Sequence, residues 1–136
     1  MFKIVQHPKV WWPVKVRGVT EEGEEVENEF KMRFVILDED DNLALQTEIS
    51  QQQIEGSKND KLEFSTLSAA IILRLAEDWR DVSMEDVDAD GKASVKSLPF
   101  TSENVTMMMK QPGVFWAITQ AYAACRYGAP KDRAGN

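Results

Sequence analysis

The sequence predicts an α+β fold in which an N-terminal β-hairpin, or small antiparallel sheet, precedes a bundle of about three to four helices. Two stretches near the N-terminus alternate apolar and polar residues with a period of two, as half-buried strands do. Beyond residue 42 the apolar residues recur at helical spacing, between glycine, proline and capping signals. We expect a single α+β domain at 1–128, with the hairpin at about 10–37, helices at about 43–127 and a flexible tail at 129–136.

The first predicted strand covers residues 10–19, where valine or tryptophan occupies every second position up to residue 16. The residues on this apolar face are Val10, Trp12, Val14 and Val16. Pro13 cannot donate a ladder hydrogen bond, so the strand is expected at a sheet edge or with Pro13 unpaired. Trp11 points away from Trp12 and lies either under a loop or at the surface, as an aromatic anchor for a partner.

The second strand, residues 26–37, follows a polar turn and is expected to pair with the first strand as a β-hairpin. Its apolar face consists of Val26, Phe30, Met32, Phe34 and Ile36. On the other face, Glu27 and Glu29 are expected across from Lys15 and Arg17. An isolated hairpin is marginal in water, so its apolar face needs a cover from the later helices or from another subunit.

The first two helices differ in the strength of their patterns. Residues 43–55 are polar and weakly patterned, with a stop at Gly56, and the acidic run at 38–41 is expected to be a solvated loop. The next helix is the best defined, because Asp60 can cap it and Glu63 can act as the reciprocal partner. Its apolar stripe, expected in the core, is Phe64, Leu67, Ile71, Ile72, Leu75, Trp79 and Val82.

The last two helices are separated by a proline–glycine break. Thr101 is predicted to cap a helix that runs to about Lys110, before Pro112 and Gly113. The final helix covers about residues 114–127. Its apolar side consists of Val114, Ile118, Ala121, Tyr122 and Cys125.

Several large apolar side chains are candidates for binding a partner. Met107 and Met108 belong to a run of three methionines that spreads around nearly the whole helix, so at least one is exposed unless another element covers it. The competing interpretation is a helix wedged between core elements, and the same alternatives apply to Phe115 and Trp116. The candidate partner-binding residues are Trp11, Trp12, Met107, Met108, Phe115 and Trp116.

Composition limits the possible functions of the 136-residue chain. Its formal net charge of −7 and dispersed basic residues argue against binding along nucleic-acid phosphates. No apolar run is long enough to span a bilayer, and the first residues do not resemble a signal peptide. Cys125 is the single cysteine, which excludes an intrachain disulfide and favours a reducing compartment, the cytoplasm.

Residues 86–97 begin like the calcium loop of an EF-hand. The carboxylates at its first, third and fifth positions are Asp86, Asp88 and Asp90. Position twelve is Ser97 instead of the bidentate glutamate that such loops require, so no metal site is predicted. We expect a polar β-turn in which Asp88 or Asp90 accepts hydrogen bonds from local amides and Gly91 has a positive φ.

The chain carries no pattern that predicts catalysis or a cofactor. His7 is the only histidine, and partners for a base or metal ligand are not evident around it. Cys125 is expected to be a buried, inert thiol on the apolar side of the last helix. Phosphate-binding, dinucleotide-binding and nucleophile-elbow motifs are absent from the sequence, so the protein is not expected to be an enzyme.

Two stretches resemble the motifs of a known family. "WPVKVRGVTEEGEEVENEFKMRFVIL", beginning at Trp12, and "LAEDWRDVSMEDVDADGKASVKSLPFTSENVTMMMKQPGVFWAITQAYAAC", ending at Cys125, resemble in order and spacing the tail assembly chaperones of long-tailed bacteriophages and prophages. In the second stretch the matching residues are Trp79, Val82, Asp90, Gly91, Pro99, Phe100, Thr101, Glu103, Asn104, Pro112, Ala121 and Tyr122. One departure is the segment at 83–97, which is longer than the turn usual in the family.

This resemblance implies a function without catalysis or cofactors. Such chaperones bind the tape-measure protein and keep it soluble while the tail tube polymerises, and they are absent from the finished virion. The implied partners are therefore the tape-measure protein and the tail tube protein, with a homo-oligomer as a further possibility, in the cytoplasm of the bacterial host. The alternatives are a structural or completion protein of the virion tail and, from Asp86, Asp88 and Asp90, a degenerate EF-hand-like calcium module.

Overall fold

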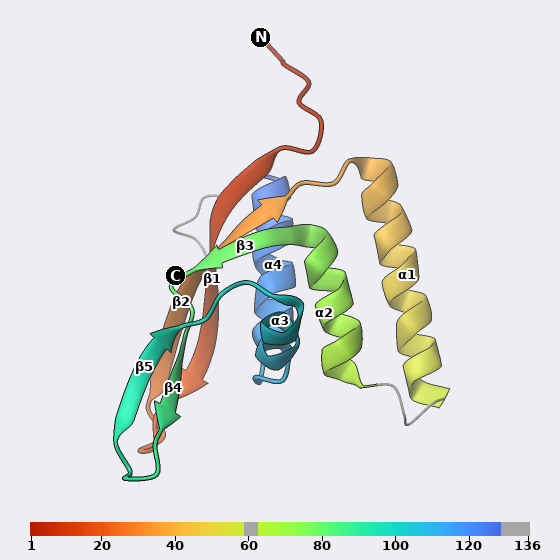
Figure 1. Ribbon diagram of the computed structural model, residues 1–136. Coiled ribbons are helices and arrows are strands. Elements are labelled where there is room, and N and C mark those ends of the chain that lie inside the picture. Colours follow the sequence, from red (N-terminus) through yellow and green to blue (C-terminus); the bar gives the residue numbers. More distant parts are fainter. Residues whose placement is uncertain (59–62, 129–136) are drawn as a thin grey trace.

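The computed structural model describes residues 1–58 and 63–128, and within them it shows two antiparallel sheets and four helices (Figure 1). The elements are β1 Lys9–Val19, β2 Glu25–Val35, α1 Glu39–Lys58, α2 Phe64–Leu75, β3 Ala76–Arg80, β4 Ser83–Val87, β5 Ala93–Ser97, α3 Ser102–Met109 and α4 Val114–Arg126. The predicted α+β class is confirmed. The expected cap at Asp60 and the expected tail at 129–136 lie outside the described residues.

The N-terminal hairpin has the predicted pairing. β1 and β2 are antiparallel, and Lys15 and Arg17 lie opposite Glu29 and Glu27. The strand order β1-β2-β3 places β1 at an edge of the sheet, which is one of the two arrangements expected for a strand that contains Pro13. The alternating valine, tryptophan, phenylalanine and methionine side chains of the two strands face the helices and form one side of the core.

The predicted continuation of the second helix through Trp79 and Val82 is wrong. α2 ends at Leu75, and the chain turns into β3, which pairs antiparallel with β2. A register shift between Arg33 and Phe34 disturbs the alternation in β3, so that its buried residues are Ala76 and Trp79, three positions apart. This spacing resembles a helical stripe, which is why the periodicity of the sequence does not reveal the strand.

The segment at 83–97 is also more regular than expected. β4 and β5 form a two-stranded hairpin, and every residue of both strands is exposed (Figure 1). Its turn confirms the expectation for this segment, because Asp88 Oδ1 accepts hydrogen bonds from the amides of Asp90 and Lys92, both at 2.9 Å. Gly91 has a φ of +79°. Without a buried face, the two strands lack the alternation by which strands are recognised in a sequence.

α1 begins earlier than expected. The acidic run at 38–41 is not a loop: Glu39, Asp40 and Asp41 form the first turn of the helix, and Asp38 Oδ1 accepts a hydrogen bond from the Asp41 amide at 2.8 Å. Acidic side chains are favourable at this end of a helix because they face the positive end of its dipole.

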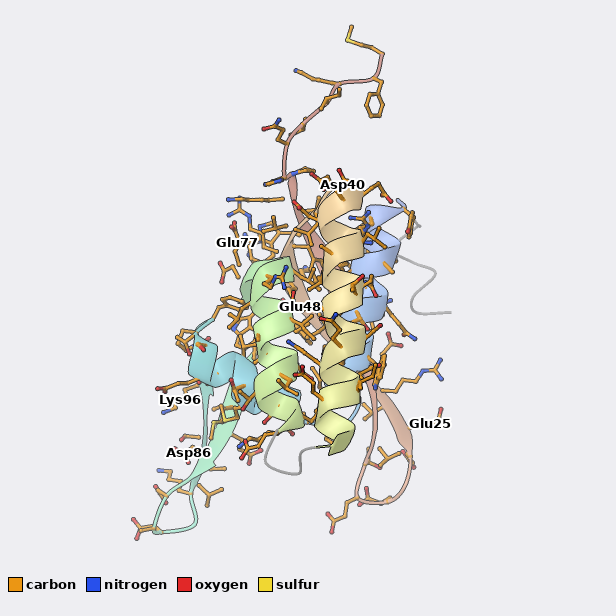
Figure 2. The ribbon with its side chains drawn as sticks, turned by 90° about the vertical axis from the view of Figure 1, so that its right-hand side faces the viewer. Glu25, Asp40, Glu48, Glu77, Asp86 and Lys96 are labelled. Atoms are coloured by element: carbon orange, nitrogen blue, oxygen red, sulfur yellow. The ribbon has the colours of Figure 1, made fainter. Side chains whose placement is uncertain are left out.

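The helices pack against one face of the main sheet. α4 lies against β1, α2 contacts β2 and β3, and α1 lies beside α2 (Figures 1 and 2). The largest fully buried side chains are Phe34, Met32, Leu45, Ile72, Met109, Ile118, Val14 and Val105. They come from the sheet and from all four helices, so one core joins these elements. Within the ranges that the structure describes, no helix combines the length and apolar character needed to cross a membrane.

Candidate partner-binding surface

Both ends of α3, the cap before it and the break between α3 and α4, are formed as the sequence predicts. Thr101 Oγ1 accepts a hydrogen bond from the Asn104 amide at 3.1 Å and so caps the start of α3. At the other end, α3 stops before Lys110, and Gly113 opens α4 with a φ of +76°. Because consecutive side chains of a helix point in different directions, Phe115 at the start of α4 is buried whereas Trp116 is 59% exposed.

Three aromatic rings form a continuous cluster beside this turn. The Phe115 ring lies edge-to-face with the Phe64 ring, with centroids 5.6 Å apart, and with the Trp116 ring at 5.5 Å. Phe64, the first residue of α2, is itself 56% exposed. We call Phe64, Phe115 and Trp116 the aromatic surface. Two of its three rings face solvent, which is an unusual place for such large apolar side chains to gather.

Several hollows lie at the aromatic surface or near it. One, of about 590 Å³, is lined by Phe64, Met109, Phe115 and Trp116 together with the turn at 110–113. A second, of about 630 Å³, lies between the far end of the β1–β2 hairpin and the α3–α4 turn, and Met108 lines it with Val16, Phe30 and Val82. A third, of about 430 Å³, lies between Trp116 and the charged residues Lys15, Arg17 and Glu27. Trp116 therefore separates two recesses, and a partner could contact this ring from either side.

The structure brings together part of the predicted partner-binding set. Phe115 and Trp116 are adjacent in the aromatic surface, and half-buried Met108 lines the neighbouring hollow. Met107 is also half-buried on α3. Trp12 belongs to the core, with 7% of its surface exposed. The sequence places Phe64 in the apolar stripe of the second helix and so predicts it in the core. The stripe does not show that α2 begins at Phe64, where the side chain is exposed.

Trp11 lies away from this surface, on the opposite face of the sheet from the core. Its ring is half-buried under Arg80 of β3, whose guanidinium carbon is 3.8 Å from the ring centroid. Trp11 is therefore covered neither by a loop nor by the helices, but by a cation–π contact from a strand that the sequence does not reveal.

A group of possible metal ligands lies where the N-terminal segment meets α1. The imidazole of His7 and the carboxylates of Asp38 and Asp41 each offer a ligand atom, and these atoms lie within 4.8 Å of one another. It is the one such group among the described residues, so Asp86, Asp88 and Asp90 do not form another. All three side chains are exposed, Asp38 already caps α1, and the positive end of the helix dipole opposes a cation here. The sequence does not predict this group, because it shows no partner for His7 and indicates a solvated loop at 38–41.

The other polar cluster links the end of α4 to the start of α1. The Arg126 guanidinium donates to the carbonyl of Leu37 and, at 2.6 Å, to the Glu39 carboxylate. Tyr122 Oη accepts a hydrogen bond from the Leu37 amide at 3.0 Å. Burial lowers the pKa of Arg126, but its interactions with Tyr122 and Glu39 outweigh that effect and raise the pKa overall. The cluster is a structural connection, and neighbouring Cys125 is half-buried rather than buried as expected.

Comparison of the chain with protein-family models, with curated proteins and with solved structures finds no match. What the protein does is therefore inferred from the aromatic surface and from the resemblance in the sequence.

Proposed function

We propose that the protein is a phage tail assembly chaperone, which binds the tape-measure protein in the bacterial cytoplasm and helps tail tube assembly without catalysis. The aromatic surface is the observation that supports this proposal most directly. Exposed Phe64 and Trp116 supply large contact area near open hollows, as expected where a partner's apolar side chains are held.

The chemistry of this surface suits an amphipathic helix. Such a helix places apolar side chains at intervals of three and four residues along one face, and these side chains insert into hollows between fixed anchors. Here Phe64 and Trp116 are the anchors, and the 590 Å³ hollow beside Phe115 receives the side chains. Glu63, Lys110 and Gln111 lie around the same hollow and form the polar rim typical of a reversible interface.

Co-expression with a phage tape-measure protein tests the proposal. The wild-type chain is expected to keep that protein in the soluble fraction, and Trp116→Ser to reduce the soluble amount several-fold, because an exposed aromatic anchor is lost. Tyr127→Ser is the matched control, since Tyr127 is a 75% exposed aromatic residue just beyond the other end of α4. An equal effect of both variants, or no effect of the wild-type chain, would contradict the proposal.

Mass spectrometry of purified phage particles separates this function from the alternative of a virion tail structural or completion protein. A chaperone is expected to be missing from the particles, whereas a structural component is present in a fixed ratio to the tail tube protein. The test requires no variant, so it does not depend on how any substitution affects folding.

A further inference from the structure

The chain before β1 is a short apolar arm, which we define as residues 1–8. Phe2 is 89% exposed, Ile4 82% and Val5 59%, and the arm extends away from the body (Figures 1 and 2). The exposure of three neighbouring apolar side chains to water is unfavourable. A contact that covered them would gain about 25 cal/mol of free energy for each Å² of apolar surface removed from water. The arm therefore has the properties of a segment that is buried in another setting.

A hollow of matching chemistry lies between α1 and α2. It has a volume of about 270 Å³ and is lined by Ile49, Gln53, Phe64, Leu67, Ile71 and Phe115. A cavity of about 150 Å³ lined by apolar side chains is enough to hold a benzene ring. One phenylalanine side chain can therefore enter this hollow, where Phe64 and Phe115 provide aromatic edges and faces.

A polar atom beside the hollow indicates what kind of segment fits. Gln52 also lines it, and among the described residues its Oε1 is one of two buried side-chain polar atoms without a hydrogen-bond partner. A helix offers few free N–H groups, because its own carbonyls accept nearly all of them. An extended arm offers free N–H groups along its length, which are the donors that an acceptor such as Gln52 Oε1 lacks.

We propose that the arm of one copy docks on a second copy of the chain, with Phe2 inserted into the hollow between α1 and α2. Charge favours this contact: residues 1–9 contain Lys3 and Lys9 and no acidic residue, whereas all 23 acidic residues follow Lys9. A basic, apolar arm is thus attracted to an acidic body.

The direction of the arm favours a second copy over the arm's own body. The Ile36 amide donates to the Pro8 carbonyl at 2.8 Å, which fixes the point where the arm leaves the sheet. His7, with a φ of +52°, lies 4.0 Å from Asp41 of α1, and beyond it the arm extends away from the body (Figures 1 and 2). Docking on its own hollow requires the arm to reverse at this fixed point, whereas a neighbouring copy can meet it as it stands.

Sedimentation of the full-length chain over a range of concentrations tests the proposal. The wild-type chain is expected to self-associate, and Phe2→Asp to raise the dissociation constant at least about tenfold, because a carboxylate cannot enter an apolar hollow. The matched control is Val95→Asp, at an apolar position 69% exposed on the β4–β5 hairpin. A chain that stays monomeric, or one in which both variants weaken association equally, would overturn the proposal.

Cross-linking shows where Phe2 lies. A photoreactive phenylalanine at position 2, in a mixture of isotope-labelled and unlabelled chains, is expected to form links between chains to α1 residues near Ile49 and α2 residues near Leu67. Links only within one chain, or to other elements, would refute arm exchange. Neither experiment involves the tape-measure protein, so failure here leaves the proposed function standing, and failure of co-expression leaves the arm proposal standing.

Discussion

At the scale of single residues, Arg126 is a charged side chain that is almost buried and interacts with groups far away in the sequence. Only 6% of its side chain is exposed, yet it joins the Leu37 carbonyl at the end of the sheet to Glu39 at the start of α1. Because the partners are 87 and 89 positions away in the sequence, the contact closes the structure between its N-terminal and C-terminal parts. Arg126 therefore stabilises the packing of the end of α4 against the end of the hairpin and the start of α1.

Arg126→Met is expected to lower the free energy of unfolding by about 1–3 kcal/mol, since the half-buried Leu37 carbonyl loses a charged donor. Urea denaturation measures the change. Glu39→Gln is the matched control, because the Glu39 side chain is 86% exposed and such a pair contributes at most about 1 kcal/mol. Equal effects of the two substitutions would show that the stabilisation comes from the ion pair with Glu39 and not from the hydrogen bond to the Leu37 carbonyl.

At the scale of elements, the two hairpins have opposite relations to the core. β1–β2 carries Phe30, Met32 and Phe34 into it, whereas β4–β5 buries no residue. Figure 2 shows β4–β5, labelled at Asp86 and Lys96, standing apart from the end of β1–β2 at Glu25. A two-stranded hairpin without a packed face is marginal in water, so β4–β5 should open without unfolding the rest.

A pair of glycine substitutions tests this independence. Gly91 and Gly23 both lie in hairpin turns, with φ of +79° and +84°, and a valine at either position is strained by roughly 1–2 kcal/mol. Gly91→Val is expected to remove hydrogen-exchange protection from β4 and β5 alone, while Gly23→Val lowers the melting temperature of the whole chain. A similar loss of melting temperature in both variants would show that β4–β5 is coupled to the core.

How far the fold can be predicted depends on whether an element has one apolar face and an undisturbed register. β1 and β2 meet both conditions, and the Thr101 cap and the Gly113 break follow from local backbone chemistry, so all of these are predictable. β3 fails the second condition because of its register shift, and β4–β5 fails the first. The aromatic surface is predicted only through Phe115 and Trp116, since the exposure of Phe64 results from where α2 begins.

At the scale of the whole molecule, the outer face of the sheet and the end around the α3–α4 turn have different surface chemistry. Charged side chains interact across the outer face of the sheet. The carboxylate oxygens of Glu77 lie 3.0 Å from Lys9 Nζ and 3.1 Å from Arg33 Nη1, and the Arg80 guanidinium covers the Trp11 ring. The end of the molecule around the α3–α4 turn has instead exposed aromatic rings and open hollows. Binding of an apolar partner is therefore expected at that end and not across the sheet.

Trp11→Ala tests this division. Because Trp11 lies on the outer face of the sheet, the variant is expected to give the same result as the wild-type chain in the co-expression assay that tests the proposed function. It is also expected to unfold cooperatively, after losing a cation–π contact of about 0.5–1 kcal/mol. Circular dichroism during heating and the co-expression assay measure the two properties. Loss of solubilisation in a folded Trp11→Ala chain would place the partner on the sheet instead.

The turn of the β4–β5 hairpin has a practical consequence. Asp88 Oδ1 and Gly91 close it locally, its strands are exposed throughout, and it contributes nothing to the core. Chain length can therefore vary between Asp88 and Lys92 without altering either the sheet or the aromatic surface. A peptide tag or fluorescent label inserted at Asp90 would make the protein detectable while leaving the aromatic surface and the hollow between α1 and α2 accessible.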